Sequence, residues 1–284
     1  MEVAPYSSIV CPIDQSPLAL EEKTYRCENG HSFDRAREGY VNLLSVQWKG
    51  SKNPGDDKLM TEARARFLRA GHYEPLMSAL ASLAQNELSG REEAQLVDAG
   101  CGEGAYLRYL GEAARSWAGG ALSLSGYDIS KPAIIAAAKE KGPISFFVAG
   151  HRHPPYATGS LSGMLSVFAF PDWHAFAKLL EIGGFVLTAE AGTDHLRELR
   201  EVLYEEVREA RSANHEAPVA AGFTLSHAQN CRFELALKSE AAIADLFKMT
   251  PHYYRVTEEA KARALALPAL ALTVDVRLEL WRKT

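Results

Sequence analysis

The sequence predicts a large α/β domain with a parallel sheet, preceded by a smaller module. From residue 95 onward, apolar segments of strand length alternate with helical patterns, and such βαβ alternation is typical of a parallel sheet covered on both faces. The chain has 284 residues, about twice the usual length of one domain. Hydrophobic residues make up 47% and charged residues 24%, values that argue against a disordered chain or a disulfide scaffold.

The beginning of the chain is predicted to form short strands and turns. Turn residues punctuate residues 9–44, including the pair Asn29-Gly30, and a polar loop is expected over 45–58. We therefore divide the chain into a first module, 1–50, and a larger domain, 51–284.

Two helices are predicted next, over 58–70 and 75–88. In the first, Leu59, Ala63 and Phe67 recur at helical spacing, and Gly71 follows as a stop signal. The elements expected after them are, in order, strand 96–99, helix 106–114, strand 122–128, helix 131–141, strands 144–148 and 164–168, helix 173–180 ended by Gly183-Gly184, and strand 185–189.

The end of the chain changes character. A long charged helix is predicted from its apolar stripe, and two segments, 231–237 and 272–280, alternate apolar and polar residues as half-buried antiparallel strands do. A parallel sheet finished by an antiparallel pair is the arrangement of class I (Rossmann-like) methyltransferases. The stripe of the helix consists of Leu196, Leu199, Leu203 and Val207.

Residues 96–104 carry the most informative motif, a strand that runs into Gly100, Gly102 and Gly104 and then into a helix. Glycines let the backbone turn sharply and approach a ligand closely, because they have no Cβ. Gly100, Gly102 and Ala105 also fit the dinucleotide pattern G-x-G-x-x-G/A, which alone is weak evidence for any one cofactor.

Two aspartates distinguish between the cofactors. Asp98 lies two residues before the first glycine, where a carboxylate would attract the amino group of a methionine moiety and repel a pyrophosphate. Asp128 ends the next strand, the position from which a carboxylate accepts hydrogen bonds from ribose hydroxyls. The pair favours S-adenosylmethionine, with a nicotinamide cofactor or a vestigial site as the alternatives.

Cys11, Asp14, Cys27 and His31 have the spacing of a zinc knuckle in which one cysteine is missing. A structural Zn²⁺ takes four ligands, mostly thiolate and imidazole, and Asp14 could supply an oxygen in place of the second thiolate. A module this small builds little core of its own, which argues for a metal. A metal-free hairpin with buried cysteines is the alternative.

Several strings of residues together resemble the RlmA-type 23S rRNA (guanine-N1)-methyltransferases. The likeness covers essentially the whole chain, and the string Glu38 to Leu44 and Gly71-His72-Tyr73 are its most specific parts, because no generic nucleotide site requires them. The strings are Cys11-Pro12, Tyr25-Arg26-Cys27, His31-Ser32-Phe33-Asp34, Glu38-Gly39-Tyr40-Val41-Asn42-Leu43-Leu44, Pro54-Gly55-Asp56, Ala70-Gly71-His72-Tyr73, the glycine loop, Gly192 with His195-Leu196, and Met249-Thr250-Pro251.

The resemblance implies methyl transfer from S-adenosylmethionine to N1 of a guanine in a 23S rRNA hairpin. It also implies a homodimer and an amino-terminal zinc module that helps to recognise RNA. Carried over by position, Tyr73, Tyr106, Leu107 and His195 would contact the cofactor beside Gly100 to Gly104 and Asp128.

The sequence departs from the family pattern at three places. Asp14 stands where the family has a zinc-binding cysteine, which puts the metal in doubt. In the segment 167–171 the proline comes one place later, and His151-Arg152 is also displaced by one. The last two departures put the target pocket and the adenine side of the cofactor site in doubt.

Guanine N1 carries a proton that must leave during transfer, and no carboxylate or histidine in the sequence is assigned as its acceptor. Phe168, Ala169 and Phe170 are candidates for the wall of the target pocket, where an aromatic face would stack on an extruded base. Ordinary packing at a strand end is the alternative for these residues.

RNA binding requires positive charge, whereas the whole chain has a formal charge of −5. Residues 26–69 hold nine Lys or Arg against six Asp or Glu, which leaves −8 for the rest of the chain. An RNA-facing first module on an acidic catalytic body is therefore expected.

Four scattered cysteines and the lack of any run of about eighteen apolar residues predict a cytoplasmic protein with reduced thiols and no membrane span. Two other functions also fit the sequence. One is a diverged relative that acts on a small molecule such as a secondary metabolite, and the other is a non-catalytic RNA-binding paralogue.

Overall fold

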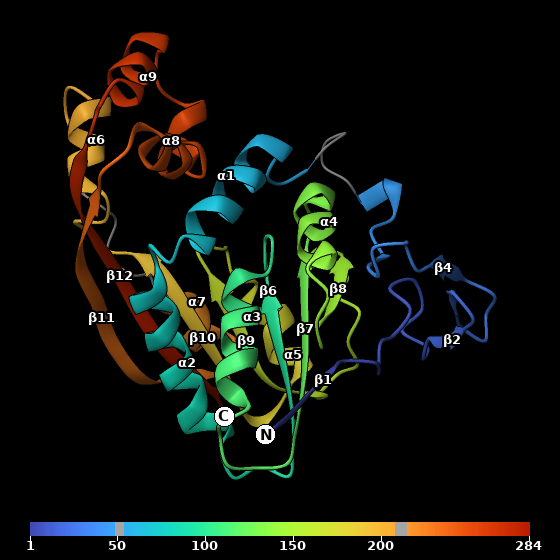
Figure 1. The fold of residues 1–284 in the computed structure, drawn as a ribbon. Coiled ribbons are helices and arrows are strands. Elements are labelled where there is room, and N and C mark those ends of the chain that lie inside the picture. Colours follow the sequence, from blue (N-terminus) through green and yellow to red (C-terminus); the bar gives the residue numbers. More distant parts are fainter. Residues whose placement is uncertain (49–53, 208–214) are drawn as a thin grey trace.

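A computed structural model describes residues 1–48, 54–207 and 215–284. Its central feature is one large sheet, to which nine strands of the described residues belong (Figure 1). These strands are β1 (Glu2–Pro5), β5 (Val41–Asn42), β6 (Glu93–Ala99), β7 (Ala121–Asp128), β8 (Ser145–Val148), β9 (Leu161–Val167), β10 (Leu180–Ala191), β11 (Phe223–Leu237) and β12 (Leu270–Lys283).

The strand order confirms the predicted parallel sheet with an antiparallel finish. The order is β11-β12-β10-β9-β6-β7-β8-β5, and β1 pairs with the first half of β7, ahead of β8. Neighbouring strands from β5 to β10 run parallel, whereas β12 runs antiparallel to both β10 and β11. The chain reverses its direction of winding at β6, so a crevice forms beyond the carboxyl end of this strand.

Helices cover both faces of the sheet. In Figure 1, α2 and α3 lie in front of it and α5 lies behind it, while α1, α8 and α9 stand above the ends of the strands. No helix of the described residues is both long and apolar enough to cross a bilayer. The helices are α1 (Lys58–Arg69), α2 (Glu74–Leu88), α3 (Ala105–Ala114), α4 (Lys131–Lys139), α5 (Trp173–Leu179), α6 (Arg197–Leu203), α7 (Glu216–Ala220), α8 (Glu240–Lys248) and α9 (Glu258–Leu265), with 3-10 turns η1 (Val46–Trp48) and η2 (Pro251–Tyr254).

The strands of the parallel sheet are buried on both faces, which explains their continuous apolar runs. Leu96 and Leu124 belong to the apolar cluster on one face, and Val97 and Tyr127 belong to the cluster on the other. Successive side chains of a strand point to opposite faces, so each strand contributes to both cores. Burial on both faces therefore fixes the carboxyl ends of β6 and β7, where Asp98 and Asp128 lie.

A small three-stranded sheet forms the amino-terminal module. Its strands are β2 (Ala19–Glu21), β3 (Thr24–Arg26) and β4 (Ser32–Asp34), which pair in the order β2-β3-β4. The chain before the module forms β1 and the chain after it forms β5, and both pair with the large sheet. The module is therefore tied to the larger body at both of its ends.

One predicted helix is much shorter than expected. The stripe from Leu196 to Val207 predicted a long helix, but α6 covers only seven residues, Arg197–Leu203. Leu196 has a φ of +53° and caps the helix, and the chain is extended again at Tyr204. The apolar residues therefore keep a helical spacing beyond the last residue whose backbone is helical.

The helix predicted over 173–180 is confirmed, but its end was placed wrongly. It stops at Leu179, and Gly183-Gly184 lie inside β10, where the pairing with β9 shifts register between Leu180 and Phe185. In the loop predicted over 45–58, Lys49 and Lys52 lie outside the described residues.

Candidate active site and metal centre

The glycine loop joins the carboxyl end of β6 to the start of α3. Gly100, Gly102 and Gly104 all have positive φ, at 84°, 55° and 78°. A Cβ on Gly100 would lie 2.8 Å from the Cβ of Ala169, and one on Gly104 would lie 2.8 Å from the Phe146 ring. Both the backbone conformation and the neighbours therefore require glycine, as the sequence motif predicted.

Asp98 lies immediately before this loop and is buried, with 1% of its surface exposed. Neither carboxylate oxygen has a hydrogen-bond partner among the described residues. Burial, with smaller effects from Asp128 and Glu103, raises the pKa of Asp98 to about 8. A buried carboxylate without a partner is costly, so this geometry fits a site that receives a cationic or hydrogen-bonding group.

Asp128 ends β7 beside the loop. Its Oδ2 accepts a hydrogen bond of 2.9 Å from the backbone N–H of Gly102, and its Oδ1 accepts one of 2.7 Å from the N–H of Ser130. The carboxylate thereby fixes the turn, and each oxygen retains a lone pair for a ligand hydroxyl. Burial raises the pKa of Asp128.

Arg64 of α1 supplies positive charge close to these acids. Its guanidinium forms an ion pair of 2.5 Å with Asp56 and donates a hydrogen bond of 3.3 Å to the carbonyl of Met249. Glu103 within the glycine loop is 3% exposed, and burial raises its pKa. Arg64 lies on an ordinary helix pattern that carries no signal of a site, whereas Glu103 stands inside the glycine motif and could have been predicted from it.

Three aromatic rings meet beside the loop. Tyr73 lies at the start of α2 and is 1% exposed, with centroid distances of 6.3 Å to both Phe168 and His195. The Tyr73 hydroxyl has no hydrogen-bond partner within the described part of the chain. The rings of Phe168 and His195 are 5.5 Å apart. Residues from the ends of three different elements thus form one wall.

Burial keeps His195 neutral, because it lowers the pKa of this histidine to about 4. The backbone N–H of Asp275 donates to Nδ1 over 3.3 Å, so the ring proton is placed on Nε2. Gly192 has no room for a side chain, since a Cβ there would lie 2.4 Å from the Asp275 carboxylate.

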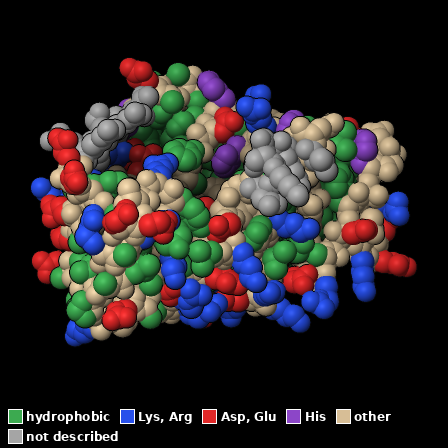
Figure 2. Space-filling view, turned by 90° about the horizontal axis from the view of Figure 1, so that it is seen from above, with side chains coloured by type: hydrophobic (Ala, Val, Ile, Leu, Met, Phe, Trp, Pro, Cys, Tyr) green, Lys and Arg blue, Asp and Glu red, His purple; other side chains and the backbone are tan. Residues whose placement is uncertain are grey.

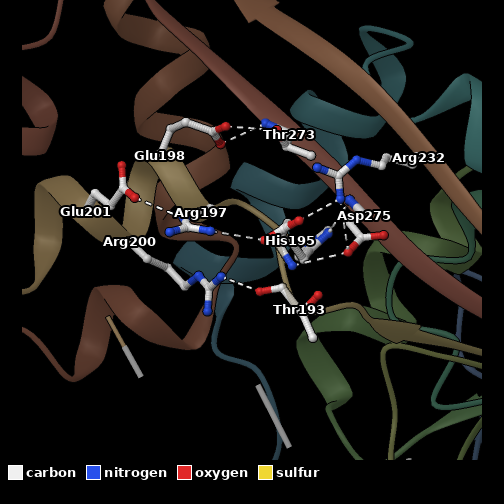
Figure 3. A network of polar contacts seen from close by, with 10 residues as sticks. Thr193, His195, Arg197, Glu198, Arg200, Glu201, Arg232, Thr273 and Asp275 are labelled. Atoms are coloured by element: carbon white, nitrogen blue, oxygen red, sulfur yellow. Dashed lines mark hydrogen bonds and ion pairs between the residues drawn. The ribbon is translucent and has the colours of Figure 1, made fainter. Parts of the chain in front are cut away.

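A network of polar contacts holds the loop that carries His195 (Figure 3). The backbone N–H of Asp194 donates to Asp275, and Arg232 forms an ion pair of 2.8 Å with Asp194. Glu198 accepts two hydrogen bonds of 2.8 Å from Thr273, one from the backbone N–H and one from the hydroxyl. Asp275 is buried in β12, although the predicted alternation places it on the polar face of that strand, so the sequence pattern gave no signal for this residue.

The remaining predicted residues differ in how far their side chains are available to a ligand. The side chain of Leu107 is fully buried in the core, so only its backbone N–H in the first turn of α3 is available to a ligand. Tyr106 lies beside it and is partly buried. Phe168 is 41% exposed next to the aromatic wall, whereas Phe170 is 92% exposed and projects into solvent.

The four predicted metal ligands come together in the small module. One ligand atom from each of Cys11, Asp14, Cys27 and His31 lies within 4.8 Å of all the others. His31 Nδ1 is 3.4 Å from the Cys27 sulfur, 3.5 Å from the Cys11 sulfur and 3.0 Å from Asp14 Oδ2. This set of two thiols, one imidazole and one carboxylate fits a tetrahedral Zn²⁺.

The strand order and the position of this site define the class of protein. A parallel sheet whose last strand enters antiparallel next to β10, with a glycine loop and two aspartates at the carboxyl ends of β6 and β7, is a class I methyltransferase fold. The dinucleotide-binding fold is the alternative and fits less well. Its sheet consists of two parallel βαβαβ halves, whereas β12 here runs antiparallel to β10.

Comparisons with known proteins identify the family. A zinc-ribbon family model, described as "RlmA, N-terminal", matches residues 9–52. The chain is 33% identical to the 23S rRNA (guanine(748)-N(1))-methyltransferase of Streptomyces fradiae, over 92% of this chain and 91% of the relative. It is 30% identical to YxjB of Bacillus subtilis (strain 168), provisionally named as a 23S rRNA (guanine-N(1)-)-methyltransferase, over 95% of both chains. The chain therefore belongs to the RlmA-type 23S rRNA (guanine-N1)-methyltransferase family.

Proposed function

We propose that this chain transfers a methyl group from S-adenosylmethionine to N1 of a guanine in a 23S rRNA hairpin. The observation that carries the proposal is the buried carboxylate of Asp98 at the edge of the glycine loop, which has no hydrogen-bond partner in the described part of the chain. A donor with an amino group and a positive sulfur would supply that partner. The substrate in this proposal, a guanine of 23S rRNA, is taken from the activity by which the relatives are named.

The residues of the chain mainly bind and align the reactants. S-Adenosylmethionine supplies a methyl group on a positively charged sulfur, which needs little further activation. Asp98 would hold the amino group, Asp128 would accept hydrogen bonds from the ribose hydroxyls, and the backbone from Gly100 to Gly104 would approach the ligand closely.

The aromatic wall would complete the cofactor site and begin the target pocket. The hydroxyl of Tyr73 and the Nε2–H of His195 are polar groups available for the cofactor, beside the backbone of Tyr106 and Leu107. The half-exposed ring of Phe168 would face an extruded guanine.

Zn²⁺ would serve a structural role in the small module, held by Cys11, Asp14, Cys27 and His31. We propose that this module contacts the rRNA and that the protein acts as a cytoplasmic homodimer, as the family resemblance implies. Within residues 1–50, the basic stretch contributes Arg26, Arg35, Arg37 and Lys49, of which Lys49 lies outside the described residues.

A groove on the catalytic body offers further basic side chains for RNA phosphates. It lies between α1, α3 and the chain after α4, and its charged lining residues are Arg69, Arg108, Arg115, Lys141, Glu103, Glu112 and Glu140. Arg69 and Arg108 form ion pairs with Glu140 and Arg115 with Glu112, so a phosphate would have to compete with these carboxylates. Figure 2, which looks down on the carboxyl ends of the strands, shows many Lys and Arg side chains along the lower edge of the view, with Asp and Glu interspersed among them. Phosphate contacts of this kind would orient the hairpin without reading its sequence.

The direct test is primer extension across 23S rRNA from cells with and without the gene, together with methyl transfer to a hairpin transcript in vitro. Methylation of N1 blocks Watson–Crick pairing, so the modified guanine should appear as a stop that the deletion strain lacks. A transfer-deficient control is Asp98→Asn. An unchanged pattern of stops, with no methyl incorporation into any rRNA hairpin, would contradict the proposal and favour a small-molecule substrate.

A further inference from the structure

The segment that follows β9 presents two phenylalanines in very different environments. Phe168 is 41% exposed, and its ring lies beside those of Tyr73 and His195. Phe170, two residues later, is 92% exposed and has no aromatic partner within the described ranges. A fully exposed phenyl ring forgoes the favourable burial that this side chain normally obtains, so its position calls for a role outside the folding of the free chain.

This segment is held rigidly on both sides. Phe168 has a φ of +52°, a conformation that non-glycine residues rarely adopt and that persists only where the surroundings enforce it. Its backbone N–H donates a hydrogen bond of 2.8 Å to the carbonyl of Ala189 in β10. On the other side the Cβ of Ala169 packs against Gly100 of the glycine loop. Phe170 is therefore presented from a fixed support that adjoins the candidate cofactor site.

We propose that Phe170 is a wedge that enters the RNA stack where the target guanine has been extruded, while Phe168 faces the extruded base. This inference rests on the proposed function. A base buried in a hairpin stem must leave its stack before its N1 can be methylated, and an apolar side chain that fills the vacated space offsets part of that cost. The backbone bends at Phe168 and Ala169, and the two rings differ strongly in exposure, so they can occupy different sites in the same RNA.

The location of Phe170 favours RNA over a protein partner. The ring projects from the carboxyl edge of the sheet, beside the glycine loop and the aromatic wall, where the target must approach. Ile182 is also highly exposed, at 78%, but it lies near the start of β10, at the opposite edge of the sheet. These two side chains therefore do not belong to one continuous apolar patch of the kind that joins protein subunits.

The test compares Phe170→Ala with wild-type protein on two RNAs, a hairpin with the target guanine paired and a single strand in which it is already unpaired. We expect kcat/KM to fall at least about tenfold more on the hairpin than on the single strand, because only the hairpin requires extrusion. Phe170→Trp should restore most of the activity on the hairpin. With 2-aminopurine at the target position, the fluorescence increase on binding should be smaller for Phe170→Ala than for wild type.

Ile182→Ala is the matched control, since it removes another highly exposed apolar side chain far from the site, and it should behave as wild type on both RNAs. Equal losses on the two RNAs would overturn the wedge. So would a change in self-association of Phe170→Ala, measured by sedimentation, without any difference between the RNAs. If wild-type protein methylates neither RNA, the proposed function fails; if it methylates the hairpin and Phe170→Ala does so equally well, only the wedge fails.

Discussion

Two regions of the molecule each hold ionisable side chains around a candidate cation site, but their surroundings differ. One is the zinc knuckle of the amino-terminal module, formed by Cys11, Asp14, Cys27 and His31, and the other is the glycine loop with Asp98. In the knuckle, Cys11 and Cys27 are buried while Asp14 is exposed, and every residue of β2 is exposed. At the loop, Asp98 and Glu103 are almost completely buried at the edge of a sheet whose two faces both carry large apolar cores.

This difference in burial indicates that the two ligands have different roles, the metal in folding and the cofactor in chemistry. A module of three short strands has little apolar area to bury, so metal–ligand bonds must replace a core. The large sheet already has its core, so its ligand is needed for chemistry and not for folding. Removal of the cation should therefore unfold the knuckle but only empty the glycine loop.

Metal removal should give the largest effect. We expect one equivalent of zinc per chain, and Cys27→Ala or a strong zinc chelator should unfold the module, since structural zinc contributes about 10–16 kcal/mol in zinc-finger peptides. Limited proteolysis should then cut within residues 9–36 while the large sheet remains resistant. Cys231→Ala, outside the cluster, is the control. A module that resists protease without metal would break the comparison.

Asp98→Asn should abolish tight cofactor binding without harming the fold. Loss of one partner of a buried ion pair costs about 3–5 kcal/mol, or roughly two to almost four orders of magnitude in affinity for S-adenosylmethionine by calorimetry. The melting temperature should not fall, because the variant removes a buried carboxylate that has no hydrogen-bond partner among residues 1–48, 54–207 and 215–284. Asp245→Asn, on α8, is the control. A large loss of stability in Asp98→Asn would show that the site belongs to the folding core.

Cofactor affinity should rise with pH. The pKa of Asp98 is about 8 in the free protein, so the carboxyl is mostly protonated at pH 6 and must lose its proton to pair with an ammonium. Affinity should increase up to tenfold per pH unit from pH 6 and level off above about 8. Calorimetry in buffers of different ionisation enthalpy should detect the released proton, and a pH-independent affinity would contradict this assignment.

The same raised pKa predicts how stability depends on pH. Since the folded protein retains a proton on Asp98 that the unfolded chain loses near pH 4, the contribution of this group to the free energy of unfolding should fall as pH rises from about 4 to 8. Asp98→Asn should flatten that slope in denaturant titrations.

Asp14→Cys should give the smallest effect, and it tests whether Asp14 is a ligand of the metal in the knuckle. A thiolate in place of the carboxylate completes a Cys₃His set, which should slow the release of zinc to a chelator. Methyl transfer should change by less than about twofold, because the metal takes no part in the reaction. Faster zinc release would show that Asp14 is not a ligand.

The parallel sheet, the glycine loop and the two aspartates could be predicted because each depends on local signals. Asp98 and Asp128 follow apolar strand runs, and the carboxyl ends of adjacent parallel strands necessarily meet at one edge. The knuckle ligands were likewise visible as a spacing of cysteine and histidine. The helices α8 and α9 are short and were not predicted, although each begins at a capping residue, Ser239 or Thr257.

The sequence by itself determined which groups are available: a carboxylate at each of two strand ends, glycines where the backbone must turn with positive φ, and four potential metal ligands. Only the tertiary structure decided which of those groups are satisfied. Asp128 accepts one hydrogen bond from the backbone N–H of Ser130 and one from Gly102 of the glycine loop, whereas Asp98 accepts none within the described residues. Phe168 turns towards Tyr73 while Phe170 turns away. Hydrogen bonding and burial depend on neighbours that are distant in the chain, and no local pattern encodes them.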